Sequence, residues 1–292
     1  MSVQTVSPEP AIEAVTPRAG VIGLGMIGGG VAVSLARSGQ VPTVYDIRPD
    51  AADELAGVPS PVGSPAEVAR ASDVVLVAVV DADQARTVLF GENGVLAGAE
   101  RGLIVVLLST VAVPVVHELA QACAEAGVAL LDCGVTPGDK AAENGLVAIL
   151  GGDETTVERA MPVLTGFAKR VVHCGPLGAG MATKIARNVI TYGTWRAVHE
   201  ATTLAGAAGV DPEKLITVIE EADPEGTTLF SWQRQRLAGV SQPLVAQVAR
   251  LLDKDLAAAQ ELAGQLGISL PLAEVTRAHG PETLGAESGE DA

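Results

Sequence analysis

The stretch VIGLGMIGGGVAVSL, residues 21–35, passes from a short apolar run through a cluster of glycines into an amphipathic run. Gly23, Gly25 and Gly28 have the spacing G-x-G-x-x-G, after the first predicted strand and at the start of the first predicted helix. This context is typical of a loop that binds the pyrophosphate of a dinucleotide on the amide groups of a helix N-terminus. We therefore favour nucleotide binding over a plain strand–helix turn that contains three glycines by chance.

Asp46 closes the second predicted strand, 18 residues after Gly28, where a carboxylate can accept hydrogen bonds from the adenosine ribose. A carboxylate also repels a 2′-phosphate, by roughly 4 kcal/mol at about 4 Å with an effective dielectric of about 20. The sequence therefore predicts NAD as the cofactor. Arg48 is a cation two residues further on that can pair with a phosphate, so NADP stays an alternative.

The remaining apolar runs predict an α/β fold. Seven runs read as strands, and most are continuously apolar, as expected for a sheet that helices cover on both faces. They are residues 21–25, 41–46, 73–80, 103–109, 128–134, 146–150 and 170–174. Helical patterns lie between several of them, at residues 28–38, 82–89, 113–126 and 153–165. This alternation predicts a Rossmann-type, doubly wound, mostly parallel sheet.

The pattern changes after residue 180, where only helical runs remain. They cover residues 180–208, 211–222, 227–238 and 243–266. The 292 residues are enough for two domains, so we expect a C-terminal all-helical domain that a long helix joins to the sheet. The predicted divisions are a flexible leader (1–18), a dinucleotide-binding domain (19–176), a helical domain (177–279) and a flexible acidic tail (280–292).

Charge and composition exclude several classes of partner. The formal net charge is −16, which repels nucleic-acid backbones and anionic membrane surfaces. No apolar run approaches the ~18 residues of a membrane span, and the N-terminus does not resemble a signal peptide. Three cysteines without CxxC spacing and four scattered histidines predict no disulfide framework and no metal site, which fits a reduced, cytoplasmic setting.

Five motifs in order resemble the β-hydroxyacid dehydrogenase family, typified by 3-hydroxyisobutyrate dehydrogenase and tartronate semialdehyde reductase. The resemblance covers about residues 20–275. The motifs are GLGMIGGGVAVSL (23–35), LLST (107–110), DCGVTPGDKAAENG (132–145), GAGMATKIARN (178–188) and LDKDL (252–256). The resemblance implies hydride transfer between a nicotinamide cofactor and a small β-hydroxy acid or its semialdehyde. It also implies a homodimer or homotetramer built through the helical domain.

The resemblance further implies roles for individual residues. Lys184 is expected to be the general acid/base, and Asn188 to orient the substrate. Thr136, Gly138 and Arg187 are expected to bind the substrate. The residues expected to bind the cofactor are Gly23, Leu24, Gly25, Met26, Ile27, Gly28, Asp46, Arg48, Val79, Val80, Gln84, Thr110 and Lys254.

Helical spacing places Lys184 and Asn188 on one face, next to an apolar row of Met181, Ile185 and Val189. A lysine at such a margin is partly desolvated, which lowers its pKa and suits it to acid–base work near neutral pH. The alternative is a lysine whose amine reaches solvent along an amphipathic helix. The upstream motifs favour the catalytic interpretation.

Two departures from the family pattern leave the substrate open. The family's Ser-Gly-Gly stands here as Thr136-Pro137-Gly138, in which proline lacks a backbone N–H. The Ala-Pro that precedes it in the family motif is replaced by Cys133-Gly134. Arg187 replaces an asparagine. It is either a substitute cation for an anionic substrate group, a charge that lowers the pKa of Lys184, or a surface residue.

Three other functions compete with this interpretation. An NADPH-dependent imine reductase shares the implied architecture but usually lacks the lysine. A relative of 6-phosphogluconate dehydrogenase would have a much longer helical domain. A non-catalytic NAD-binding module would not need Lys184 and Asn188 together.

Overall fold

The computed structural model describes residues 16–286, and the chain divides into two compact units, with Asn188 ending the first and Val189 starting the second. Residues 1–15 of the predicted leader and 287–292 of the predicted tail lie outside the described residues. Arg18 is described, and its guanidinium pairs with Asp73 at 3.0 Å. No helix among residues 16–286 is both long and apolar enough to cross a bilayer.

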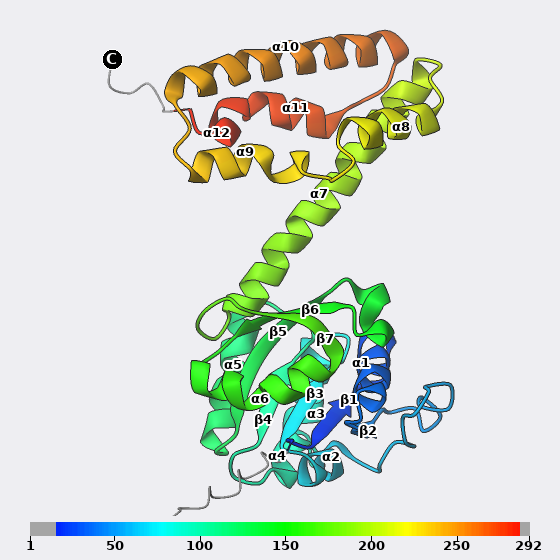
Figure 1. Cartoon of the computed structure of the whole chain (residues 1–292), viewed down its shortest axis with the longest axis vertical. Coiled ribbons are helices and arrows are strands. Elements are labelled where there is room, and N and C mark those ends of the chain that lie inside the picture. The colour runs from blue at the N-terminus through cyan, green and yellow to red at the C-terminus, as the bar shows by residue number, and fades with distance from the viewer. Residues whose placement is uncertain (1–15, 287–292) are drawn as a thin grey trace, which may run out of the picture. The chain divides into compact units, whose positions relative to one another are not determined.

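The first unit is built on one seven-stranded sheet of order β2-β1-β3-β4-β5-β6-β7 (Figure 1). The strands are β1 (Ala19–Ile22), β2 (Thr43–Tyr45), β3 (Val74–Val77), β4 (Ile104–Leu107), β5 (Ala129–Thr136), β6 (Leu146–Gly151) and β7 (Ala168–His173). All neighbours run parallel except β5 and β6. This confirms the predicted mostly parallel sheet. Since β1 lies between β2 and β3, the glycine turn after β1 opens at the switch point of the strand order, where such sheets bind ligands.

Two apolar clusters pack on the two faces of the sheet. One includes Leu35 and Phe167 and packs α1 and α6 against the strands. The other includes Leu89 and Leu119 and packs α2, α3, α4 and α5. The helices are α1 (Met26–Arg37), α2 (Pro65–Ala71), α3 (Ala82–Phe90), α4 (Val95–Gly98), α5 (Val113–Glu125), α6 (Glu154–Phe167) and α7 (Ala179–Ala207), with a 3-10 helix η1 (Gly138–Glu143). The short helices α2, α4 and η1 were not predicted, because a helix of only a few residues is too short to show a clear helical periodicity.

The long helix α7 is attached to the sheet by a buried carboxylate. Asp132 lies on β5, is 0% exposed, and accepts hydrogen bonds from the backbone N–H groups of Gly178 at 2.7 Å and Met181 at 2.5 Å. Gly178 immediately precedes α7 and Met181 lies in its first turn, where backbone N–H groups have no partner within the helix. A negative charge is also favourable at this end of the helix dipole. The contact therefore fixes where α7 begins relative to β5.

The apolar row predicted on α7 is only partly buried in the single chain. Met181 is fully buried in the cluster beneath α7, whereas Ile185 and Val189 are 37% and 70% exposed. The periodicity of this row therefore does not report packing along the whole helix.

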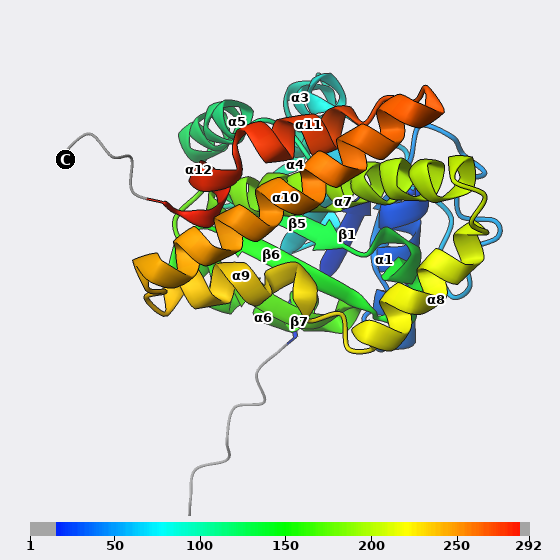
Figure 2. The same ribbon diagram turned by 90° about the horizontal axis from the view of Figure 1, so that it is seen from above.

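In the described part of the second unit, residues 189–286, all the regular secondary structure is helical, as predicted (Figure 2). It comprises the end of α7 together with α8 (Pro212–Ala222), α9 (Thr228–Leu237), α10 (Gln242–Leu266), α11 (Pro271–Ala278) and α12 (Gly280–Leu284). Helix α10 packs against α11 and α12. Helix α12 falls in the segment predicted as a flexible tail. Its Leu284 is 5% exposed. Burial of this apolar side chain stabilises a short helix in a segment that the acidic composition predicted to be flexible.

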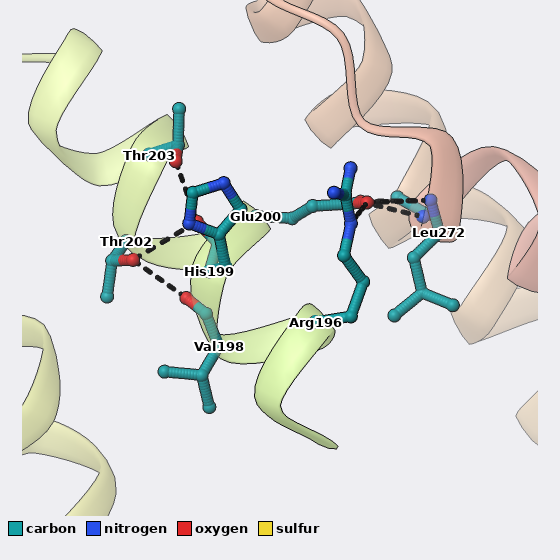
Figure 3. A network of polar contacts seen from close by, with 8 residues as sticks. Arg196, Val198, His199, Glu200, Thr202, Thr203 and Leu272 are labelled. Atoms are coloured by element: carbon teal, nitrogen blue, oxygen red, sulfur yellow. Dashed lines mark hydrogen bonds and ion pairs between the residues drawn. The ribbon is translucent and has the colours of Figure 1, made fainter. Parts of the chain in front are cut away.

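Glu200 makes a contact in the second unit like that of Asp132 in the first: a buried carboxylate accepts hydrogen bonds from the backbone at the start of a helix. Its side chain on α7 is 5% exposed and accepts hydrogen bonds from Leu272 N at 2.8 Å, from Ala273 N at 3.2 Å and from the Arg196 guanidinium at 2.7 Å (Figure 3). Burial acts to raise the pKa of Glu200, but these hydrogen bonds outweigh it and hold the pKa below its usual value. An ionised Glu200 therefore caps α11.

Replacing Asp132 by alanine is expected to lower the free energy of unfolding of the first unit by at least about 2 kcal/mol, since two charge-assisted hydrogen bonds are lost and two buried N–H groups are left without partners. Asp153 is the control, because its exposed carboxylate caps α6 through Thr156 N at 2.9 Å. Asp153→Ala should cost about 1 kcal/mol. Urea unfolding measures both, and equal losses would contradict the anchoring role of Asp132.

Candidate functional site

A pocket of about 700 Å³ lies at the carboxyl ends of the first three strands. Its lining residues come from the turns after β1, β2 and β3 and from α3, and they include Gly23, Gly25, Asp46, Arg48, Val79, Val80 and Gln84. Seven of the residues predicted to bind a cofactor therefore meet in one pocket. The volume suits a small organic ligand.

The glycine turn has the geometry that an anion site needs. Gly23 has φ 88°, and a Cβ there would lie 2.6 Å from the Ala78 carbonyl oxygen. A Cβ on Gly28 would collide with the Gly23 carbonyl oxygen. Gly25 differs, since a Cβ there would meet no heavy atom within 4 Å. Gly25 is also the N-cap of α1 and offers no side-chain cap, so the first turn of α1 opens onto free space where a phosphate fits.

Asp46 is tied into this turn. Its carboxylate accepts from Leu24 N at 2.7 Å, from Arg48 N at 2.9 Å and from Arg48 Nε at 3.1 Å. Burial acts to raise the pKa of Asp46, but the hydrogen bonds from Arg48 and Leu24 hold it below its usual value. The carboxylate is therefore ionised at neutral pH. Each of its oxygens accepts more than one hydrogen bond, so ribose hydroxyls remain possible partners.

Other predicted cofactor residues surround the turn. Met26 and Val80 are 73% and 82% exposed, which is unusual for apolar side chains beside a pocket and suits contact with a ligand. Gln84 accepts from Val80 N at 3.0 Å and so fixes the turn after β3. Thr110 is exposed and follows Ser109, whose hydroxyl donates to the Val79 carbonyl at 2.7 Å.

Lys254 belongs to the other unit of the chain. It lies on α10 in the second unit, is exposed and pairs with Asp255 at 3.0 Å. Its expected role at the cofactor stays a prediction.

The loop predicted to bind the substrate packs on the helix that carries the glycine turn. The buried Ser34 hydroxyl of α1 donates to the Ala141 carbonyl at 2.7 Å and accepts from Asn144 N at 3.0 Å. A Cβ on Gly138 would lie 3.1 Å from Ile27 Cδ1 and 3.2 Å from Met26 Cε. The Thr136-Pro137-Gly138 segment therefore borders the start of α1.

Lys184 reaches the same region from α7. Its Nζ donates to the Val135 carbonyl at 2.6 Å, and its side chain is half-buried. Burial lowers the pKa of Lys184 below its usual value, and the charge of Arg187 lowers it further. The Arg187 guanidinium donates to Asn188 Oδ1 at 3.3 Å. Lys184, Arg187 and Asn188 thus form one polar group beside the end of β5.

Two residues near Lys184, Asp132 and Gly134, were not among the predicted site residues. Alternation along β5 puts Asp132, Gly134 and Thr136 on one face. Asp132 holds the start of α7, and Gly134 lies directly against the Lys184 side chain. Asp132 could have been identified from the sequence, because it is a charged residue inside the apolar run LLDCGV, and charged residues are rarely buried unless they are paired. No local signal marks Gly134, because its neighbour comes from a distant segment.

No group of three or more His, Cys, Asp or Glu side chains in the described part of the chain could hold a metal ion.

Comparison with known sequences shows which families of protein this chain resembles. Residues 18–175 match the family model for the NAD binding domain of 6-phosphogluconate dehydrogenase, and residues 178–292 match that for the NAD-binding of NADP-dependent 3-hydroxyisobutyrate dehydrogenase. An uncharacterised oxidoreductase of Mycobacterium tuberculosis is 32% identical over 268 residues, which cover 89% of this chain and 90% of the relative. The L-threonate dehydrogenase of Cupriavidus necator is 34% identical over 256 residues, 87% of this chain and 86% of the relative.

Solved structures share the fold. A crystal structure of a putative oxidoreductase from Mycobacterium avium superposes with a TM-score of 0.80 at 27% identity, covering 93% of this chain and all of the other. An imine reductase variant from Myxococcus stipitatus in complex with NAD⁺ gives 0.78 at 20% identity, covering 94% of this chain and 96% of the other. The second likeness shows the fold alone.

Substitution of Gly25 by alanine is expected to leave folding intact and weaken nucleotide binding. The new Cβ meets no protein atom and φ is −69°, but it occupies the space in which a phosphate approaches the backbone. We expect a dissociation constant for NADH about tenfold or more above that of the unchanged chain, about 1.4 kcal/mol, by fluorescence titration. Gly206→Ala, also in open space, is the control. Equal affinities of both variants would refute this phosphate site.

Proposed function

We propose that Lys184 is the general acid and base of this chain, which belongs to the β-hydroxyacid dehydrogenase family and is an NAD(P)-dependent hydroxyacid dehydrogenase. One observation carries the proposal: the half-buried amine of Lys184 donates to the Val135 carbonyl at 2.6 Å, at the end of β5 that leads to Thr136. A lysine with a lowered pKa in this position is suited to exchange a proton with a substrate oxygen.

A nicotinamide cofactor held in the pocket at the glycine turn would accept a hydride from the carbon that carries the substrate hydroxyl on oxidation and would supply it on reduction. On oxidation, neutral Lys184 takes the proton of that hydroxyl. On reduction, the ammonium group returns it to the carbonyl oxygen. An ammonium group has three N–H donors. One is directed to Val135, which holds the amine in place and leaves the others for the substrate oxygen.

We propose a small β-hydroxy acid or its semialdehyde as the substrate class. The Thr136 hydroxyl and the Gly138 N–H are the proposed donors to its carboxylate. Asn188 would orient the reacting end by hydrogen bonds. Arg187 adds a positive charge beside Lys184, which favours an anionic substrate and compensates for the amide that Pro137 lacks.

We propose NAD as the preferred cofactor. The ionised Asp46 stands in the pocket, and its charge opposes a 2′-phosphate. Arg48 is bound to this carboxylate, so a 2′-phosphate would have to compete for the guanidinium. Both effects favour the unphosphorylated ribose.

We also propose a homodimer or homotetramer formed through the helical unit. Several large apolar side chains of that unit are exposed in the single chain, among them Trp195 at 64%, Val218 at 64% and Leu237 at 80%. Exposed apolar surface of this kind marks protein interfaces. A cytoplasmic location is proposed on the cysteines, since Cys123, Cys133 and Cys174 are all unpaired.

Lys184→Ala should lower kcat by about 10²–10⁴-fold, the usual contribution of a general acid or base, while the dissociation constant for NADH stays unchanged. In the unchanged chain the oxidation rate should rise with pH through the pKa of Lys184, below the ordinary value of about 10.4, because the neutral amine is the base. That rise should vanish in Lys184→Ala. The exposed Lys214 provides the matched control, Lys214→Ala. Retained turnover in Lys184→Ala would remove the lysine from the mechanism.

Steady-state turnover tests substrate and cofactor together. 3-Hydroxyisobutyrate, glycerate, 3-hydroxypropionate and L-threonate are each assayed with NAD and NADP, and a set of cyclic imines is assayed with NADPH. We expect turnover with a hydroxy acid and a higher kcat/KM with NAD. Reduction of imines alone, with NADPH, would overturn the proposed substrate class. A preference for NADP would overturn only the role of Asp46.

A further inference from the structure

Gly134 occupies a regular position in β5, so its backbone does not explain why it is glycine. It pairs with Ile149 of β6 in the antiparallel ladder, and it is not among the glycines with positive φ. Any residue could adopt this extended conformation. The reason for the missing side chain must therefore be what lies above it.

The space above Gly134 is filled by Lys184. A Cβ at residue 134 would collide with Lys184 Cβ and would lie 2.7 Å from Cγ and 3.2 Å from Cδ. These are its three nearest neighbours, and all belong to the lysine side chain rather than to the backbone of α7. The aliphatic stem of Lys184 thus runs directly over the bare Cα of Gly134 before its amine reaches Val135 O.

The helix cannot easily move away to make room. Asp132 holds the first turn of α7 through Gly178 N and Met181 N. Between these two residues, Gly180 packs so tightly on β6 that a Cβ would lie 2.5 Å from the Ile149 carbonyl oxygen. A side chain at residue 134 would therefore turn the lysine stem aside rather than displace α7.

We propose that Gly134 is a positioning residue for Lys184: its missing side chain forms the groove that directs the lysine stem along β5 and sets the amine against Val135 O. This inference rests on the proposed function, because the position of the amine affects the reaction only if Lys184 exchanges the proton. Displacement of a catalytic group by about 1 Å can cost about 10²-fold in rate.

The first test measures the amine itself and needs no turnover. The chain has five lysines, so competitive acetylation across a pH series, followed by peptide mass spectrometry, gives the pKa and reactivity of each. In Gly134→Ala we expect the pKa of Lys184 to rise toward the ordinary lysine value. Its labelling at a pH well above that pKa, where the amine is neutral in both proteins, should increase because the displaced amine is more exposed. Lys140, Lys169, Lys214 and Lys254 should be unchanged.

Gly20→Ala is the matched control. It adds a Cβ at an equally crowded place in the same sheet, 2.5 Å from Ser72 Oγ and Val68 Cγ1, but far along the chain from Lys184. Its Lys184 labelling should equal that of the unchanged chain. The same Lys184 labelling in Gly134→Ala as in Gly20→Ala would overturn the proposal.

The second test is a double-mutant cycle with Lys184→Gly, which removes every atom that the new Cβ would meet. We expect Gly134→Ala to lower kcat about 10–100-fold with an unchanged dissociation constant for NADH, and to cause no further loss in the Lys184→Gly background, since interacting residues are not additive. Gly134→Ala should also lower the thermal stability of the unchanged chain but not that of the Lys184→Gly variant. This comparison tests the contact with the lysine side chain even if Gly134→Ala alone does not fold. An equal loss in both backgrounds would show general damage and overturn the inference.

The two proposals fail separately. If Lys184→Ala keeps its kcat, the catalytic role of the lysine is refuted, and the labelling experiment still decides whether Gly134 positions the amine. If Lys184→Ala is inactive but Gly134→Ala leaves its labelling and kcat unchanged, only the positioning role is refuted.

Discussion

The buried carboxylate of Asp132 is the constraint on which the candidate site depends. It joins the middle of a sheet strand to the first turn of the long helix α7. A carboxylate in the interior is tolerated because two N–H groups without helical partners donate hydrogen bonds to it. With the start of α7 fixed, helical geometry alone determines that residues 184, 187 and 188 follow on the side of β5.

Strand β5 then contacts the helix α7 and leads into the proposed substrate loop. One face packs Leu131, Cys133 and Val135 into the core, while the alternate residues meet α7. The strand continues into the loop that Ser34 fastens to α1. The glycine turn, the substrate loop and the lysine are thus held by hydrogen bonds and close packing within one unit. Pre-organisation of this kind reduces the entropy lost when reacting groups are brought together.

The prediction from sequence was strongest where chemistry is local. The G-x-G-x-x-G spacing lies in one strand–turn–helix segment and Asp46 directly follows the next strand, and a pocket lined by Gly23, Gly25 and Asp46 is present. The strand–helix alternation likewise predicted the sheet. Prediction failed for short helices such as α2, and for α12, where the burial of Leu284 outweighs an acidic composition. The exposure of Ile185 and Val189 shows that helical periodicity alone does not establish burial.

The amino-acid sequence by itself determined the class of fold, because strand–helix alternation depends on residue types at short spacing along the chain. The glycine spacing predicted the phosphate loop, and the resemblance to the family, not the local spacing, pointed to the candidate acid–base lysine. Only the tertiary structure decided what surrounds that lysine: the carbonyl of Val135, the bare Cα of Gly134 and the carboxylate that anchors its helix. These contacts join residues about 50 positions apart. The geometry of these contacts is set by the packing of α7 on β5, and no local sequence pattern predicts it.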